Sequence, residues 1–126
     1  MTSDEQKAAN YTDLLVWQKG MDLVNETYTI TRAFPADEKF GLVAQMRRAA
    51  VSIPSNIAEG QARHTTGEFV QFVSHAEGSV AELRTQFLIA VQLGYCTKSH
   101  ARRAFELMSA LRKMLNALRR TLAARS

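Results

Sequence analysis

Hydrophobic residues recur every three or four positions along most of the chain, which is the pattern of amphipathic helices. Four such stretches follow one another, at about residues 13–33, 35–61, 65–94 and 99–123. The connections between them are short, and short connections between long helices make neighbouring helices antiparallel. The sequence therefore predicts an all-α fold, an antiparallel up-down-up-down four-helix bundle.

The ends of the predicted helices are set by residues with known end preferences. Asp13 is a plausible N-cap of the first helix. Pro35 suits the first position of the second helix. Thr65 and Glu68 have the spacing of a capping box at the start of the third helix, and Gly94 is expected to end it. These limits place one bundle domain at residues 13–123, between a flexible segment at 1–12 and a short tail at 124–126.

The second stretch combines an apolar stripe with a file of polar residues, and it contains a proline, Pro54, that should bend the helix. The polar file is too regular for a random surface. We interpret it as a structural network of hydrogen bonds and ion pairs, inside the bundle or between subunits. Its expected members are Arg47, Arg48, Ser52, Asn56 and Glu59 of this helix, with Glu77 and Glu82 of the third. The alternative, that Arg47 or Arg48 contacts phosphate, is disfavoured by the neighbouring carboxylates.

Positive charge is concentrated at the end of the chain. Residues 97–126 contain eight Lys or Arg and one acid, a net charge of +7, whereas residues 1–96 contain eight basic and eleven acidic residues, a net charge of −3. A helical face rich in basic residues is typical of nucleic-acid binding, although it is also compatible with an ordinary solvated surface. The residues expected to bind nucleic acid lie opposite the leucine seam of the fourth helix: Arg102, Arg103, Arg112, Lys113, Arg119 and Arg120.

Catalytic and metal-binding patterns are not found in the sequence. The three histidines are scattered, the Glu-x-x-His pairs of bundle metal sites are missing, and no phosphate-binding glycine loop occurs. The single cysteine, Cys96, cannot form an internal disulfide, and we interpret it as an inert small residue. We therefore expect a protein that is not an enzyme, with no cofactor and no metal. The polar N-terminus and the lack of a long apolar run predict a cytoplasmic protein without a membrane partner.

Four segments carry a resemblance to a known family. They are DLLVWQKGMDL at Asp13–Leu23, FPADEKFGLVAQMRRAAVSIPSNIAEG at Phe34–Gly60, GEF at Gly67–Phe69 and GSVAEL at Gly78–Leu83. The chain resembles, from about Tyr11 to Leu122, the bacterial four-helix-bundle proteins encoded within 23S rRNA intervening sequences. The same family includes the accessory protein of diversity-generating retroelements. One departure is Gly20, where the family usually has alanine, so the first helix is expected to be weaker or packed more closely there.

The resemblance also implies an assembly, because members of this family form homopentameric rings. A homopentamer would explain the two apolar files of the first helix, since a helix that is apolar over a wide arc is usually covered from two directions. Two functions remain open at this point. One is RNA or DNA binding without strong sequence preference. The other is a protein-interaction scaffold that docks a partner such as a reverse transcriptase.

Overall fold

The computed structural model describes residue 11 and residues 14–125, and most of these belong to four long helices. A short 3-10 helix lies between the first two, and no strand occurs in this part of the chain. In chain order the elements are α2 at Leu15–Thr31, η2 at Ala36–Glu38, α3 at Leu42–Gln61, α4 at Thr66–Gln92 and α5 at Arg102–Arg125.

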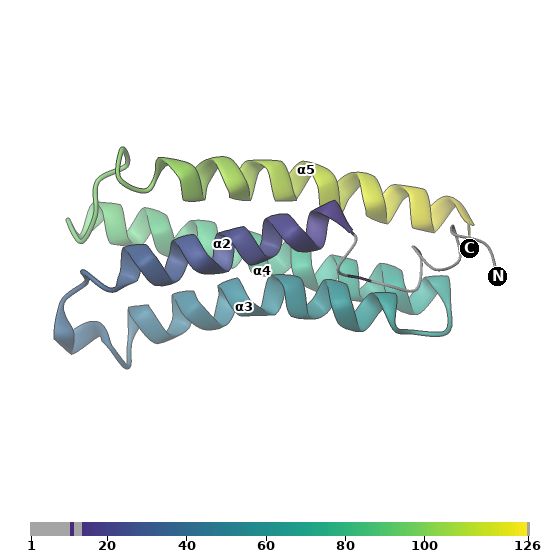
Figure 1. The fold of residues 1–126 in the computed structure, drawn as a ribbon, viewed down its shortest axis with the longest axis horizontal. Helices are drawn as coiled ribbons and strands as arrows, with labels where there is room; N and C mark the ends of the chain where they lie inside the picture. The colour runs from purple at the N-terminus through teal and green to yellow at the C-terminus, as the bar shows by residue number, and fades with distance from the viewer. Residues whose placement is uncertain (1–10, 12–13, 126) are drawn as a thin grey trace.

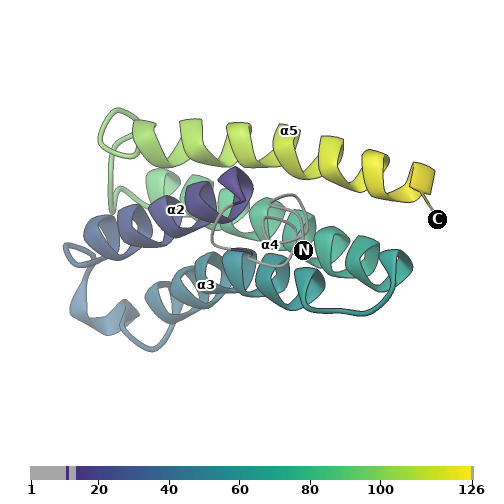
Figure 2. The ribbon, with the colours of Figure 1, turned by 45° about the vertical axis from the view of Figure 1, so that its right-hand side comes forward.

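Each long helix packs against two others, in the pairs α2–α3, α3–α4, α4–α5 and α2–α5. In Figure 1 the α2–α3 and α4–α5 connections lie at the left end of the molecule, and the α3–α4 connection lies at the right end. Figure 2 shows α4 behind α2, between α3 and α5. The predicted all-α fold with four packed helices is thus confirmed.

The core runs along the middle of the bundle and is built from the predicted apolar stripes. Large side chains from all four helices are completely buried, and they include Leu23, Met46, Ile53, Ile57, Leu83, Phe87, Leu111 and Leu115. Two threonines, Thr27 and Thr31, are also buried in α2. The hydroxyl of each threonine donates a hydrogen bond to the backbone carbonyl four residues earlier, so neither leaves an unpaired donor in the core.

The predicted start of the second helix at Pro35 is wrong. Pro35 precedes η2, and α3 begins only at Leu42, after Gly41 breaks the helical backbone with φ −103° and ψ −111°. The Glu38 carboxylate accepts a hydrogen bond from the Leu42 N–H at 3.1 Å. This contact satisfies one of the open donors at the start of α3. A Cβ at position 41 would lie 2.8 Å from that same carboxylate, so any residue other than glycine would require the Glu38 side chain to shift.

The other helix ends follow the sequence more closely. Thr65 is the N-cap of α4 and accepts from the Glu68 N–H at 3.1 Å, as predicted. Gly94 follows α4 with the positive φ of 80° expected at such an end. The fourth helix differs, because residues 98–101 form turns and α5 runs from Arg102 to Arg125. The predicted N-cap, Asp13, and most of the flexible segment at 1–12 lie outside the described residues, as does residue 126.

Two small details of the α2–α3 contact bear on the sequence prediction. Pro54 is buried inside α3, and the helix continues past it to Gln61. Gly20 of α2 faces Pro54, and a methyl group at position 20 would meet the proline ring at 3.4 Å. The two helices therefore pack closely at Gly20, which agrees with the expectation of closer packing at this position. Alanine would make an ordinary van der Waals contact there.

Candidate nucleic-acid interface

A continuous set of basic side chains covers the outer surface of α5 and its boundary with α4. We call this set the basic strip. Its members are Arg84, Lys98, Arg102, Arg112, Lys113 and Arg120. All six are exposed, and none forms an ion pair with another residue that the structure describes. At the helical rise of about 1.5 Å per residue, the part of the strip on α5 extends for roughly 27 Å.

Two of the six predicted nucleic-acid-binding residues do not belong to the strip. Arg119 turns toward α4, where its Nε donates to Glu77 Oε1 at 2.7 Å and its Nη2 donates to Asn116 Oδ1 at 2.7 Å. Arg103 turns toward α2, with its Nε 3.5 Å from Glu26 Oε1. Each arginine therefore has its charge balanced by a carboxylate of a neighbouring helix.

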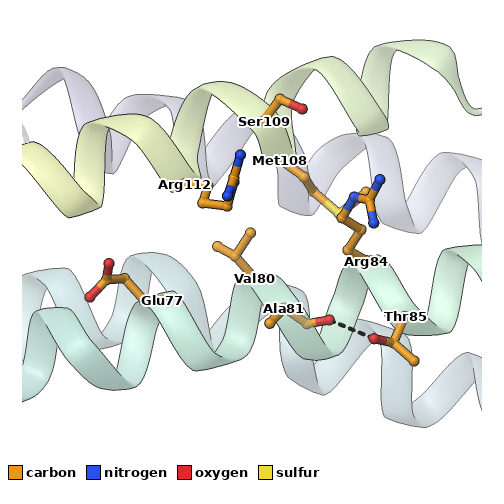
Figure 3. Close-up of a pocket in the computed structure, with 8 residues that line it drawn as sticks. All are labelled: Glu77, Val80, Ala81, Arg84, Thr85, Met108, Ser109 and Arg112. Atoms are coloured by element: carbon orange, nitrogen blue, oxygen red, sulfur yellow. Dashed lines mark hydrogen bonds between the residues drawn. The ribbon is translucent and has the colours of Figure 1, made fainter.

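A groove between α4 and α5 lies within the basic strip (Figure 3). It has a volume of about 450 Å³, and its residues are Glu77, Val80, Ala81, Arg84, Thr85, Met108, Ser109 and Arg112. We call it the central groove. Arg84 rises from α4 and Arg112 from α5, so a cation stands on each wall, with Val80 and Met108 between them. Glu77 lies at the end near Arg112, where Arg119 balances its charge.

A second groove continues the first toward the start of α5. It has a volume of about 440 Å³, and its residues are Arg84, Lys98, Ser99, Arg102, Phe105 and Ser109. We call it the Phe105 groove. It shares Arg84 and Ser109 with the central groove, so the two form one path along the α4–α5 boundary. No acidic side chain lines this second part.

Sequence reasoning missed Arg84 and did not assign Lys98 to the site. Arg84 belongs to the third helical stretch, whose other charged residues are mostly acidic. The signal that could have found it is its place on the helix, one residue beyond the buried Leu83 and four beyond the buried Val80. Arg84 therefore lies at the edge of the buried face of its helix, beside the helix that packs against that edge. Only the structure identifies that helix as α5.

The polar network predicted around α3 is divided into separate contacts. Arg47 lies against α2, where its Nε donates to Thr31 Oγ1 at 3.0 Å and its guanidinium stacks 4.4 Å from the Tyr28 ring centroid. No acid is involved in these contacts. Arg47 therefore joins α2 to α3 through a hydroxyl and an aromatic face.

A second part of the predicted network joins α3 to α4. The hydroxyl oxygens of Ser52 in α3 and Ser79 in α4 are 2.6 Å apart, whereas Asn56 donates to the Ser52 carbonyl at 2.7 Å within α3. Further along α4, Gln86 is buried and donates weakly to the exposed Glu82 at 3.5 Å. The bond to Glu82 comes from the amide nitrogen of Gln86, and its side-chain oxygen Oε1 has no hydrogen-bond partner among the described residues.

The structure does not bring the remaining predicted members together. Arg48 is exposed, and so is Glu59, whose carboxylate lies 3.8 Å from Arg63 one turn later. Glu77 pairs with Arg119 of α5 instead of an arginine of α3. Arg48 and Glu59 therefore have no shared partner among the described residues, and a role for them between subunits stays a prediction.

One more polar contact joins the α4–α5 connection to η2, at the end of the bundle where α4 and α5 are connected. The Tyr95 hydroxyl donates to Glu38 Oε2 at 2.7 Å, and the Tyr95 ring packs 5.5 Å from that of Phe34. The hydrogen bond from Tyr95, and then that from the Leu42 N–H, lower the pKa of Glu38 below its ordinary value. The same bond to Glu38 is the main reason that the pKa of Tyr95 is raised.

The described residues offer little other chemistry. Among them, no group of three His, Cys, Asp or Glu side chains is placed to hold a metal ion. No helix in this part of the chain has the length and apolar character needed to cross a bilayer. Cys96 is half-buried, and burial raises the pKa of its thiol, so the unreactive protonated form is favoured.

Comparison with known proteins identifies a family. The model of a family described as 23S rRNA-intervening sequence protein matches residues 12–117. No curated protein matches the chain. The matched range contains all of the segments on which the resemblance was based, so the resemblance is confirmed.

Proposed function

The chain belongs to the 23S rRNA-intervening sequence protein family, and we propose that it is a non-enzymatic, homo-oligomeric protein of the bacterial cytoplasm that binds RNA or DNA. In this proposal an antiparallel up-down-up-down bundle is the subunit. The basic strip contacts phosphates, with Arg102, Arg112, Lys113 and Arg120 as its members on α5. Phosphate contacts position a protein without reading bases, so binding has little sequence preference.

The observation that carries the proposal is the lack of acidic partners for the basic strip. Surface arginines and lysines that only keep a protein soluble are usually mixed with acids, as Arg103 is with Glu26 and Arg63 with Glu59. The six strip residues form no ion pair with any described residue, although neighbouring members line the same grooves. Their mutual repulsion favours a polyanion as a ligand, because a polyanion with several phosphates would relieve it.

Self-association is supported by the apolar surface of α2. One of its files is buried in the bundle, whereas the other remains partly exposed, with Met21 at 38%. This second file borders a groove of about 310 Å³ whose other wall comes from α3 and includes Val51, which is 41% exposed. We propose that another subunit covers this surface and that the closed assembly is a pentamer, as the family resemblance implies.

Salt titration of nucleic-acid binding tests the phosphate contacts. We compare the wild type with Arg112→Gln/Lys113→Gln, and with the control Arg32→Gln/Lys39→Gln, which removes the same charge from exposed residues of the α2–α3 connection. The logarithm of affinity should fall with the logarithm of salt concentration by roughly 0.7 per single-strand contact or 0.9 per duplex contact. The slope of the strip variant should be smaller by the contribution of two contacts, and the slope of the control should equal that of the wild type.

Two outcomes would contradict binding through the basic strip. One is no detectable complex of the wild type with long RNA or DNA at about 50 mM salt, where such contacts are strong. The other is an equal loss of affinity in the strip variant and the control, since this would mean that net charge alone is responsible.

Sedimentation equilibrium tests the assembly. A monomer at micromolar concentration would contradict the oligomer, and a closed assembly with another number of subunits would contradict the pentamer. If Arg48 and Glu59 lie between subunits, then Arg48→Ala or Glu59→Ala should weaken the assembly or lower its melting temperature, whereas Arg125→Ala at the end of α5 should do neither. Unchanged size and melting temperature in all three variants would show that the two residues are only solvated.

A second candidate function is a protein-interaction scaffold without a direct nucleic-acid role, for example one that docks a reverse transcriptase. The observation in its favour is the apolar surface at one end of the bundle, where Phe40 is 89% exposed and Leu93 is 56% exposed. A scaffold of this kind should lose its protein partner in Phe40→Ser/Leu93→Ser, and its activity should not depend on the basic strip.

A further inference from the structure

Phe105 is an aromatic side chain within the basic strip. It is half-buried, and the part of its surface that the core does not cover lines the Phe105 groove. On the core side it packs against the fully buried Phe87, with ring centroids 5.9 Å apart and planes at 57°. One side of the ring is therefore packed against the core, and the other side faces a groove whose charged residues are all cations.

The cations approach the ring from both helices. Arg84 comes from α4, Arg102 is the first residue of α5, and Lys98 lies four positions before it. The Arg84 guanidinium carbon is 6.0 Å from the Phe105 ring centroid, at the outer limit of about 6 Å for a cation–π contact. The contact is thus a weak one, and Arg84 keeps its hydrogen-bond donors for another partner. None of the three cations has an ion-pair partner among the described residues.

An aromatic ring set in a positively charged groove is how proteins hold single-stranded nucleic acid, with the bases stacked on the ring and the phosphates on the cations. We infer that the Phe105 groove is such a site, in which an unpaired nucleobase stacks on Phe105 while the adjoining phosphates bind Arg84, Lys98 and Arg102. This inference rests on the proposed function, and it adds a preference for single strands. A base in a duplex reaches the ring only after it is flipped out, which costs free energy.

We expect the site to prefer single strands to duplexes but not to distinguish one base sequence from another. Every nucleobase has a π-face, so stacking on Phe105 tolerates all four bases. RNA and DNA single strands share the same faces and phosphates, and both should bind. The central groove continues the path past Arg112, so a strand several nucleotides long can follow the α4–α5 boundary.

The experiment compares strands with and without bases. The probes are 20-nucleotide oligothymidylate, oligouridylate, an abasic deoxyribose-phosphate strand of the same length, and a DNA duplex. The variants are Phe105→Leu, Phe105→Tyr and, as a matched control, Phe69→Leu, which changes a half-buried phenylalanine of α4 that lines neither groove. Melting temperatures establish that each variant is folded.

Phe105→Leu should bind both base-containing strands about 5- to 150-fold more weakly, which corresponds to the loss of ~1–3 kcal/mol for one stacked base. It should bind the abasic strand and the duplex as the wild type does. Phe105→Tyr, which keeps a ring, and Phe69→Leu should bind all probes with wild-type affinity. The wild type should prefer the single strands to the duplex.

If Phe105→Leu does not fold, Phe105→Trp in a Trp17→Phe background gives a second measurement, because Trp17 is the one tryptophan of the chain. Its emission should be quenched by oligothymidylate and not by the abasic strand. Equal quenching by both strands would overturn the inference, as would an equal loss of affinity on both in Phe105→Leu. In either case strong binding of the wild type to the duplex would leave the proposed function intact. Wild-type protein that binds none of the four probes would overturn both.

Discussion

Replacing Glu77 by glutamine should weaken the fold slightly and strengthen the binding of nucleic acid. Glu77 accepts a hydrogen bond of 2.7 Å from Arg119 Nε, and the two side chains are 23% and 37% exposed. The substitution keeps the shape of the side chain and an acceptor oxygen, but it removes the negative charge. Arg119 then becomes a cation without a counter-charge, beside the central groove and within reach of a bound strand.

The cost in stability follows from the change in the hydrogen bond. A bond to a charged group contributes about 1.5–3 kcal/mol, whereas a bond between neutral groups contributes about 0.5–1.5 kcal/mol. Because both side chains are partly solvated, values near the lower ends of these ranges apply, and the free energy of unfolding should fall by about 1 kcal/mol. For a domain of this size, that change lowers the melting temperature by roughly 4 °C.

The gain in affinity follows from counterion release. One additional phosphate contact per subunit makes the salt slope steeper by roughly 0.7 for a single strand or 0.9 for a duplex. Relative to 1 M salt, the same contact raises the affinity by about 5- to 8-fold at 0.1 M. Salt titrations and urea denaturation of the same preparations measure the two effects together, at one protein concentration because self-association also affects stability.

Two control variants separate the release of Arg119 from a general change of charge. Glu106→Gln removes one negative charge from the exposed surface of α5, where the carboxylate pairs with no described basic residue, so it should leave the salt slope unchanged. Arg119→Gln should lower stability and should not steepen the slope, since it removes a cation and leaves the Glu77 carboxylate without its partner beside the groove. A slope that steepens equally in Glu106→Gln and Glu77→Gln would refute the reasoning, and so would weaker binding by Glu77→Gln.

The remaining predictions concern stability. Gly60→Ala should lower the free energy of unfolding by about 1 kcal/mol, because a methyl group there would lie 2.8 Å from Phe72 Cβ and the steric cost of about 1–3 kcal/mol exceeds the helix-propensity gain of about 1. Gly78→Ala meets no atom within 4 Å and should raise the same quantity by about 1 kcal/mol, so equal urea midpoints for the two variants would contradict this account. The Tyr95–Glu38 contact should contribute stability only at intermediate pH. The lowered pKa of Glu38 makes the contribution fade as pH falls below the ordinary value of 4.5, and the raised pKa of Tyr95 makes it fade as pH rises above the ordinary value of 10.0. The deficit of Tyr95→Phe in pH-dependent melting should therefore shrink at both extremes, and a deficit independent of pH would count against it.

The number, order and core faces of the helices could be predicted from the sequence because they depend on local periodicity. The stripes of three-four spacing mark the faces that are buried, and the Thr65 cap and Gly94 depend only on their neighbours in the chain. The start of α3 could not be predicted in this way. Pro35 favours a helix start, but the carboxylate of Glu38, held by Tyr95 from a distant part of the chain, reaches Leu42 and fixes the start there.

The candidate site was predicted only in part, for a different physical reason. A helical wheel shows that Arg103 and Arg119 lie away from the core, but it does not show which helix stands beside each of them. Their partners, Glu26 and Glu77, come from residues far away in sequence. Arg84 was missed for the same reason, because its place in the basic strip depends on the packing of α4 against α5.

Arg103 and Arg119 each pair with a carboxylate of another helix, and this determines where unpaired positive charge remains on the surface of α5. Arg103 lies beside a carboxylate of α2 and Arg119 is hydrogen-bonded to one of α4, so part of the positive charge at the two flanks of α5 is offset. What remains is the outward file of α5 and the grooves along α4, a surface much narrower than the face that a helical wheel suggests. A narrow strip with an aromatic ring in its path suits the backbone of one strand better than the two backbones of a duplex, which are separated by the width of a groove, about 6 Å or 12 Å in B-DNA. The acids of α2 and α4 thus affect how nucleic acid would bind without touching it, by deciding which arginines stay available.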